Sequence, residues 1–177
     1  AMGDPTDTCL SVILTHDGGN KWYKSDCSNL PEIEQGEAAF AASNSNIALY
    51  KNNIWMVTGG AKARVFHSPN FGKKWKVYNT PILQGGKMTG IYSVAFYDEN
   101  IGIIMGGDWE NKKNTTATKA MTMDGGKTWK LIANGEIPGF ISCVQFVPDT
   151  HGKELAAVST EGFYYSKNTG KTWTKWS

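Results

Sequence analysis

The sequence predicts an all-β protein built from repeated antiparallel sheets. The first observation is a pattern of the form Ser/Thr-x-Asp/Asn-x-Gly-x-x-Trp, which occurs four times, at residues 15–22, 68–75, 122–129 and 166–173. The second is that short apolar or β-branched runs flank the copies and are bounded by Gly, Asn and Asp, as in hairpins. Self-similarity along a chain indicates a repeat architecture.

The spacing of the copies predicts which architecture this is. The third position of each copy is Asp or Asn, and successive positions lie 53, 54 and 44 residues apart: Asp17, Asn70, Asp124 and Asn168. A period near 50 residues is typical of one four-stranded blade of a β-propeller. We therefore expect a β-propeller of four-stranded antiparallel blades, of which this chain supplies about three and three-quarters.

Each copy is expected to be a structural turn between two strands. The Asp or Asn side chain can accept hydrogen bonds from N–H groups of the turn, and the Gly fits a position that needs positive φ. The Trp begins the return strand and packs under the turn; these residues are Trp22, Trp75, Trp129 and Trp173. A row of carboxylates for metal is the alternative. Because two of the four positions are neutral Asn, on separate blades, we expect no metal site.

These four copies resemble the Asp-box, or BNR, repeat of sialidases, two-propeller xyloglucan hydrolases, sortilin-type receptors and photosystem II assembly-factor-like propellers. The chain also resembles bacterial BNR-repeat proteins, some of them labelled oxidoreductases. Its glycine pairs Gly59-Gly60 and Gly106-Gly107 lack the fingerprint of a dinucleotide site. The resemblance implies that the box is a turn at the blade periphery. It also implies a complete propeller of six to eight blades, with this chain as its C-terminal half.

The blades are expected to follow one another within one domain. Residues 1–35 form an incomplete first blade, and full blades span 36–87, 88–138 and 139–177. The innermost strands align on phenylalanines and are predicted at Glu37–Ser43, Ile91–Tyr97 and Ile141–Val147, each followed by a second strand at Ile54–Thr58, Ile101–Met105 or Glu154–Val158.

The first blade is expected to lack its innermost strand. The opening Ala1–Asp4 matches the end of a second strand, Ile104–Asp108. An open half-propeller leaves apolar faces and strand edges without partners. We therefore expect the missing propeller half or a second chain as a partner, or self-association.

Composition and charge exclude several classes of partner. Charged residues make up 19% and aromatic residues 12% of the chain, which fits a globular β protein and argues against disorder. The net charge of +2 is too small to favour nucleic acid. We also expect no membrane insertion, because the sequence has no run of 18 apolar residues.

The cysteines predict a compartment. Cys9 and Cys27 lie symmetrically about the first repeat turn, where an antiparallel hairpin would place them opposite each other. A disulfide between them would indicate an oxidising environment, and hence an extracellular or periplasmic protein. The alternative is two free thiols in a cytosolic sheet. Cys143 is expected to be a small buried side chain.

No catalytic set is visible, so whether the protein is an enzyme stays open, with the balance against it. The sialidase resemblance implies three arginines at the substrate carboxylate, and this chain has one, Arg64. Glycoside hydrolysis needs two opposed carboxylates, for which Glu37, Asp108 and Asp4 are candidates. The three histidines show no ligand spacing. We expect no cofactor.

The sequence therefore favours a non-catalytic binding or scaffold propeller that recognises a protein or glycan partner. Trp109, beside two carboxylates in the largest insertion, could stack on a sugar or a partner. The candidate binding residues at the central pocket and its loops are Glu37, Arg64, Tyr92, Asp108, Trp109 and Ser142. The alternative function is a fragment of a glycoside hydrolase, sialidase-like or xyloglucanase-like, whose catalytic set is completed by the missing half. A third is a structural subunit of a larger complex.

Overall fold

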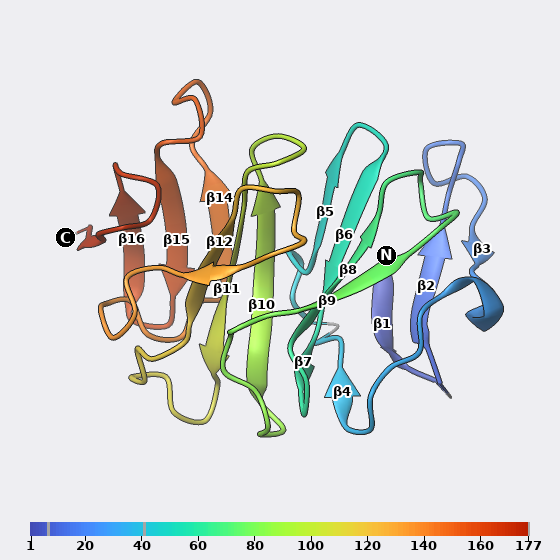
Figure 1. Cartoon of the computed structure of the whole chain (residues 1–177), viewed down its shortest axis with the longest axis horizontal. Helices are drawn as coiled ribbons and strands as arrows, with labels where there is room; N and C mark the ends of the chain where they lie inside the picture. Colours follow the sequence, from blue (N-terminus) through green and yellow to red (C-terminus); the bar gives the residue numbers. More distant parts are fainter. Residues whose placement is uncertain (7, 41, 177) are drawn as a thin grey trace.

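The computed structural model describes residues 1–6, 8–40 and 42–176. These residues form antiparallel strands joined by turns, with a single turn of 3₁₀ helix, η1 (Cys27–Asn29). Four sheets lie side by side along the longest axis of the molecule (Figure 1). The prediction of an all-β protein is confirmed.

The first sheet has three strands in the order β1-β2-β3, and the second and fourth sheets have four each. The strands of the first and second sheets are β1 (Met2–Pro5), β2 (Leu10–Leu14), β3 (Tyr23–Lys24), β5 (Ile47–Tyr50), β6 (Asn53–Val57), β8 (Arg64–Ser68) and β9 (Lys76–Asn79). Those of the fourth are β14 (Cys143–Phe146), β15 (Leu155–Ser159), β16 (Gly162–Ser166) and β17 (Thr174–Lys175).

The third sheet has six strands, because two short strands from before and after β6 add to its edge. Its order is β13-β12-β11-β10-β7-β4. The strands are β4 (Glu37–Ala38), β7 (Gly59–Gly60), β10 (Thr89–Phe96), β11 (Gly102–Asp108), β12 (Lys119–Thr122) and β13 (Lys130–Leu131). The pairing of Gly90 in β10 with Gly59 in β7 makes the link. The division into blades at residues 36, 88 and 139 stays a prediction.

The innermost strand of the second sheet is not where the sequence predicted it. Residues 37–43 were expected to form it, but β5 occupies residues 47–50 and pairs with β6 through a tight turn after Tyr50. Phe40, the expected anchor, has φ 47° and lies outside any strand. This left-handed backbone breaks an extended chain. In the observed register Leu49 corresponds to Phe96 and Phe146. Each of the three pairs with a residue of the second strand, and that residue pairs in turn with the first residue of a repeat turn.

The four repeat turns share four hydrogen bonds. In the third, the Asp124 carboxylate accepts the N–H of Thr128 at 2.9 Å and the Thr122 hydroxyl at 2.8 Å. The hydroxyl of Thr122 also accepts the N–H of Gly126, whose φ is 89°. The indole of Trp129 donates to the carbonyl of Gly126 at 2.9 Å. Each side chain of the pattern therefore stabilises the turn itself.

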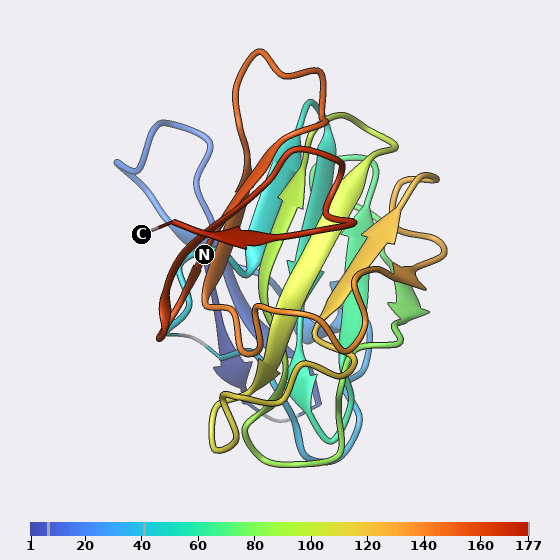
Figure 2. The same ribbon diagram turned by 90° about the vertical axis from the view of Figure 1, so that its left-hand side faces the viewer.

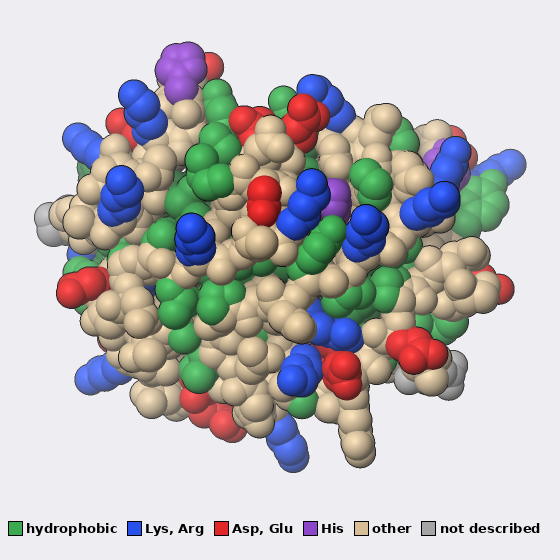
Figure 3. Space-filling model, in the orientation of Figure 1, with side chains coloured by type: hydrophobic (Ala, Val, Ile, Leu, Met, Phe, Trp, Pro, Cys, Tyr) green, Lys and Arg blue, Asp and Glu red, His purple; other side chains and the backbone are tan. Residues whose placement is uncertain are grey.

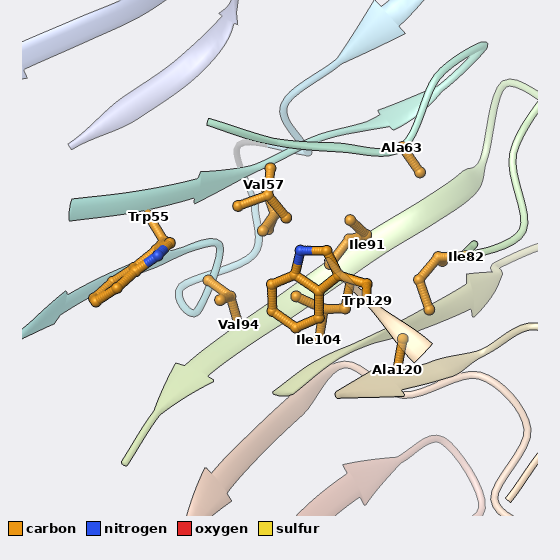
Figure 4. Close-up of a cluster of buried hydrophobic side chains, with 10 residues drawn as sticks. Trp55, Val57, Ala63, Ile82, Ile91, Val94, Ile104, Ala120 and Trp129 are labelled. Atoms are coloured by element: carbon orange, nitrogen blue, oxygen red, sulfur yellow. The ribbon is translucent and has the colours of Figure 1, made fainter. Parts of the chain in front are cut away.

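The repeat tryptophans pack each sheet against the sheet before it. Trp129 belongs to the core between the second and third sheets, and Trp173 to the core between the third and fourth; their exposed fractions are 8% and 7%. Figure 4 shows the first of these cores, with Trp129 between side chains of both sheets. Trp75 packs between the first and second sheets. Trp22, in the first sheet, is 52% exposed.

The predicted disulfide between Cys9 and Cys27 is confirmed, with the two Cα atoms 5.6 Å apart. Cys9 is buried with Leu10 and Val12 in the core between the first two sheets. The bond ties the start of β2 to η1, across the hairpin that contains the first repeat turn.

Replacing Asp124 by Ala should lower the free energy of unfolding by about 1 kcal/mol, the usual cost of losing a side-chain cap. Burial would raise the pKa of this carboxyl, but hydrogen bonds from Thr128, Thr122 and Lys127 outweigh it and lower the pKa to about 2. Because the folded pKa is depressed, the stabilisation is present above about pH 4 and is lost as the pH falls toward 2. Urea unfolding at several pH values measures this.

The matched control is Asp124→Asn. Asn168 accepts the corresponding N–H at 3.0 Å and donates to the Thr172 hydroxyl at 2.9 Å, so an amide can serve the same turn. The Asn variant should be almost as stable as the parent at pH 7 and lose the acid-dependent part. Equal losses for Ala and Asn at pH 7 would contradict this account of the turn.

Reducing the disulfide should lower the free energy of unfolding by about 3 kcal/mol, the value expected for a loop of roughly this length. The measurement is thermal unfolding of the protein and of the Cys9→Ser/Cys27→Ser variant, with and without reductant. The free thiol Cys143 provides the control, because Cys143→Ser should retain the full response to reductant. A parent protein that unfolds at the same temperature in reductant would contradict the prediction.

Candidate functional site

The segments that enter the innermost strands gather at one end of the sheets. In the second, third and fourth sheets the innermost strand starts where the second strand ends, because the two are antiparallel. The third strand finishes at the opposite end, so the repeat turns lie away from these segments. Loops at the starting end surround a cavity of about 940 Å³. Its walls come from residues before β5, from both ends of the β10–β11 hairpin and from the segment entering β14.

A row of four aromatic rings lines the cavity. Phe40 stacks on Tyr92 with 4.2 Å between ring centroids, and Phe140 meets Tyr92 edge-on at 4.7 Å. Trp109 in turn meets Phe140 edge-on at 5.4 Å. All four residues line the cavity. Such offset and edge-to-face pairs fix ring orientation and form an apolar surface before any ligand arrives.

Glycines let Phe40 and the strands below it come this close. A Cβ on Gly59 would lie 2.2 Å from the Phe40 ring, and one on Gly106 would lie 1.9 Å from the Gly90 carbonyl oxygen. The glycine pairs at 59–60 and 106–107, which carry no dinucleotide motif, thus serve close backbone approach.

Phe140 is positioned from the other side by a buried lysine. Lys119 is 1% exposed, and its ammonium donates to the carbonyls of Glu136 and Pro138, both at 2.7 Å. Burial lowers the pKa of Lys119 to about 8, with the nearby carboxylate of Glu136 opposing the shift. These bonds anchor the segment that carries Phe140 into the cavity wall.

Tyr92 contributes its ring and keeps its proton. Its hydroxyl donates to the Met88 carbonyl at 2.9 Å. Burial raises its pKa to about 12, and the carboxylates of Asp108 and Glu110 add to the shift. Tyr92 is therefore neutral at physiological pH.

Trp109 is the exposed end of the aromatic row. Its side chain is 44% exposed, and the Lys112 ammonium lies 4.1 Å from the ring centroid. The Trp109 indole at the rim thus carries a positive charge over one of its faces.

The structure brings together three of the six predicted binding residues. Tyr92, Trp109 and Ser142 line the cavity, and Asp4, considered for catalysis, lies there too. Asp108 lies outside the lining and accepts the N–H of Glu110 at 2.8 Å.

Glu37 and Arg64 lie outside the cavity lining and form a buried ion pair. The Glu37 side chain is fully buried and accepts bonds from the Arg64 guanidinium, the Thr58 hydroxyl and the Glu34 N–H. Glu37 lies in β4, at the edge of the third sheet, so its predicted placement on an innermost strand was wrong. Its acceptor sites are used within the protein, which makes it a structural carboxylate.

Phe40, Met88 and Phe140 line the cavity and were missed as site residues. The signal that could have found them is position in the repeat. Met88 and Phe140 lie one and three residues before β10 and β14, and Phe40 lies in the segment that leads to β5; all three are at the end where Tyr92 and Ser142 also lie. The predicted strand at residues 37–43 concealed this position, because it placed Phe40 inside a strand and not in the segment before one.

The part of the chain that the structure describes contains no group of three His, Cys, Asp or Glu side chains that could hold a metal ion. Within the same residues, no helix has the length and apolar character needed to cross a membrane. Charged side chains of both signs are interspersed over the face shown in Figure 3.

Comparison with known proteins identifies the fold. The sequence has no significant match among protein-family models or curated protein sequences. The structure is similar to YCF48 from Cyanidioschyzon merolae, with a TM-score of 0.56, 16% identity, and coverage of 94% of this chain and 48% of that one. A structure of YCF48 bound to D1 peptide has a TM-score of 0.55 and 20% identity over 74% of this chain and 38% of that one.

The GH74 enzyme of Niastella koreensis is also similar, with a TM-score of 0.53, 15% identity, and coverage of 98% of this chain and 31% of that one. All of these neighbours are β-propellers. The chain therefore has a β-propeller fold and spans less than half the length of these solved structures.

Replacing Arg64 by Ala should lower the free energy of unfolding by about 3–5 kcal/mol, because it leaves the Glu37 carboxylate buried without its partner. The control is Glu37→Gln with Arg64→Met, which keeps an acceptor for Thr58 and removes both charges. This double variant should be clearly more stable than Arg64→Ala in urea unfolding. A single variant as stable as the parent would contradict the structural role of the pair.

Proposed function

We propose that this protein is a non-catalytic binding propeller, and that the aromatic cavity holds an apolar segment of a protein partner. The observation that carries the proposal is the row from Phe40 to Trp109, which is preformed and opens at a partly exposed tryptophan. Concave, mostly aromatic sites with a few polar groups are typical ligand sites. Lys87 on the cavity wall and Lys112 at the rim would favour a partner segment with a carboxylate nearby.

A protein partner is favoured over a glycan by the chemistry of the wall. Tyr92 donates its hydroxyl to the backbone, and Asp4 accepts the N–H of Ala39 at 3.0 Å, so both are partly committed to the fold. A glycan site needs many free polar groups beside its stacking rings. The binding of D1 peptide by YCF48, a protein of similar fold, gives a precedent for a protein ligand.

The glycoside hydrolase alternative rests on the GH74 neighbours and on Trp109 as a sugar platform. The difficulty for this alternative is that glycoside hydrolysis needs two opposed carboxylates. Among the described residues that line the cavity, Asp4 alone carries a carboxyl group. Since hydrolysis requires a second carboxylate about 5 to 10 Å away, the missing half of the propeller would have to supply it.

We further propose that other blades complete the ring. On this proposal the repeat turns are Asp boxes, and residues 1–35, 36–87, 88–138 and 139–177 form consecutive blades, the first incomplete. The outer faces of the two end sheets are uncovered, as the exposed side chains of Trp22 at one end and of Phe163 and Trp176 at the other indicate. Figure 2 looks onto the C-terminal end sheet. The disulfide supports an extracellular or periplasmic location.

The test of the proposed function is binding to arrays of random peptides and of glycans. The parent should bind peptides rich in aromatic and aliphatic residues, and Trp109→Ala should weaken binding at least about ten-fold, as expected for a central aromatic contact. Trp22→Ala removes another exposed tryptophan, one outside the cavity, and should leave binding unchanged. Binding to glycans alone, lost in Trp109→Ala, would favour the hydrolase alternative and overturn the protein-partner proposal.

A further inference from the structure

The outer edge of the four sheets carries a row of exposed lysines. We propose that this edge binds an acidic polysaccharide, whose carboxylate or sulfate groups pair with the ammonium groups of the row. The inference goes beyond the proposed function, because it concerns the repeat turns and outermost strands and is independent of what the cavity binds.

The charges of the chain are separated between this edge and the rest of the molecule. The four repeat turns and the outermost strands that follow them span residues 15–24, 68–79, 122–131 and 166–175. Ten of the 18 basic residues lie in these segments but only two of the 16 acidic ones, so the segments carry a formal charge of +8 and the rest of the chain −6. The net charge of +2 conceals this separation. The ten residues, called the lysine band below, are Lys21, Lys24, Lys73, Lys74, Lys76, Lys127, Lys130, Lys167, Lys171 and Lys175.

Every sheet contributes to the lysine band. Each has at least one of these lysines in its repeat turn and one in its outermost strand, and all ten residues are exposed. Since the four sheets lie side by side along the longest axis of the molecule, the band follows that axis (Figure 1). Stacked sheets are about 10 Å apart. The band therefore presents clusters of positive charge at roughly this spacing or wider, which suits a long polymer with repeated negative groups.

The lysines of the band have no partners of opposite charge within the described residues. The ion pairs found there join Lys51 to Glu99, and Arg64 to Glu34 and Glu37. The two aspartates of the same segments accept hydrogen bonds from their own turns. Ten like charges along one edge repel one another, and a polyanion would relieve this repulsion.

Protection of the sheet edges explains only part of the band. Lysines on edge strands discourage pairing with another chain. That role accounts for the four that lie in outermost strands, Lys24, Lys76, Lys130 and Lys175. The other six lie in the repeat turns, which have no ladder edge to protect. Binding of one partner that extends across the four sheets accounts for all ten.

A polysaccharide fits this edge better than nucleic acid does. Proteins that bind single strands stack the bases on aromatic side chains, but Trp129 and Trp173 are buried under their turns. Arginine is the residue suited to bidentate recognition of phosphate, and the one arginine of the chain, Arg64, lies outside the band. The disulfide also supports a location outside the cytosol, away from most nucleic acid.

A flexible chain also fits the edge better than a membrane does. The sheets of a propeller are arranged radially, so their outer edges lie on a convex surface. A flat bilayer would contact the lysines of one or two sheets at a time. A polysaccharide can follow the curved row and pair with lysines of all four sheets.

The experiment measures binding of the protein to two acidic polysaccharides, polygalacturonate for carboxylate groups and dextran sulfate for sulfate groups. The protein should bind at least one of them at about 0.01 M salt and be released before about 1 M salt, because the screening length falls from roughly 30 Å to 3 Å. It should not bind neutral dextran. Absence of binding to both acidic polymers at low salt would overturn the proposal.

The test variant is Lys73→Glu with Lys127→Glu, which reverses two charges of the band in neighbouring sheets. Its affinity should be at least about ten-fold weaker, because two ion pairs are replaced by repulsion. The matched control is Lys62→Glu with Lys113→Glu. These two residues are also exposed, lie in loops at the opposite end of the sheets, and lower the net charge by the same amount. The control should bind as the parent does, and equal losses for the two variants would contradict a site at the band.

Further measurements separate the lysine band from the cavity and from other partners. Trp109→Ala should keep the parent's affinity for the acidic polysaccharide, whereas loss of binding would place the polymer in the cavity and overturn the inference. Tighter binding to duplex DNA, or to vesicles that contain phosphatidylglycerol, than to either polysaccharide would show that the assigned class of partner is wrong. Peptide binding at the cavity is measured separately, so either proposal can fail while the other stands.

Discussion

The fold depends on one constraint, that the apolar faces of neighbouring sheets cover each other. The chain meets it by sending the tryptophan of each repeat turn against the preceding sheet, and the second strand supplies the other side of the contact. Trp129 shares one core with Trp55, and Trp173 shares the next with Ile103, so the arrangement occurs twice. A cross-sheet hydrogen bond from Trp55 to the Gly125 carbonyl, at 2.9 Å, ties a turn to the neighbouring sheet.

The same constraint explains what the ends of the molecule expose. Trp22 has no sheet before it among the described residues and is half exposed, although its turn has the same hydrogen bonds as the others. At the other end, Phe163 and Trp176 form part of an open apolar surface. Turn formation and burial are therefore separable, because the turn is local whereas burial needs a neighbouring sheet.

The candidate site also follows from the radial arrangement. Innermost strands that start at the same end bring their entering loops together, so residues distant in sequence such as Phe40, Tyr92 and Phe140 form one wall. The repeat turns are directed to the opposite end by the strand order alone. The molecule thus separates the turns that hold it together from the loops that form the candidate site.

Local features could be predicted from the sequence because they are encoded within a few residues. The repeat turns need only their own side chains, and the disulfide needs only two positions in one hairpin. The innermost strand β5 was missed because Phe40 looked like the anchor found in Phe96 and Phe146, although a left-handed backbone at that residue prevents it. Glu37 was mistaken for a channel residue because its partner Arg64 lies 27 positions away, and only the fold brings them together.

The most direct measurement is amide hydrogen exchange of the chain alone, strand by strand, at a concentration where its native mass is that of a monomer. If covered faces stabilise the sheets, β10 and β11, with neighbours on both sides, should exchange slowest. The first sheet and β15 and β16 should exchange at least about ten-fold faster, through local opening. Equal protection of β15, β16, β10 and β11 in the monomer would contradict the account, because the end sheets would then be stable without cover.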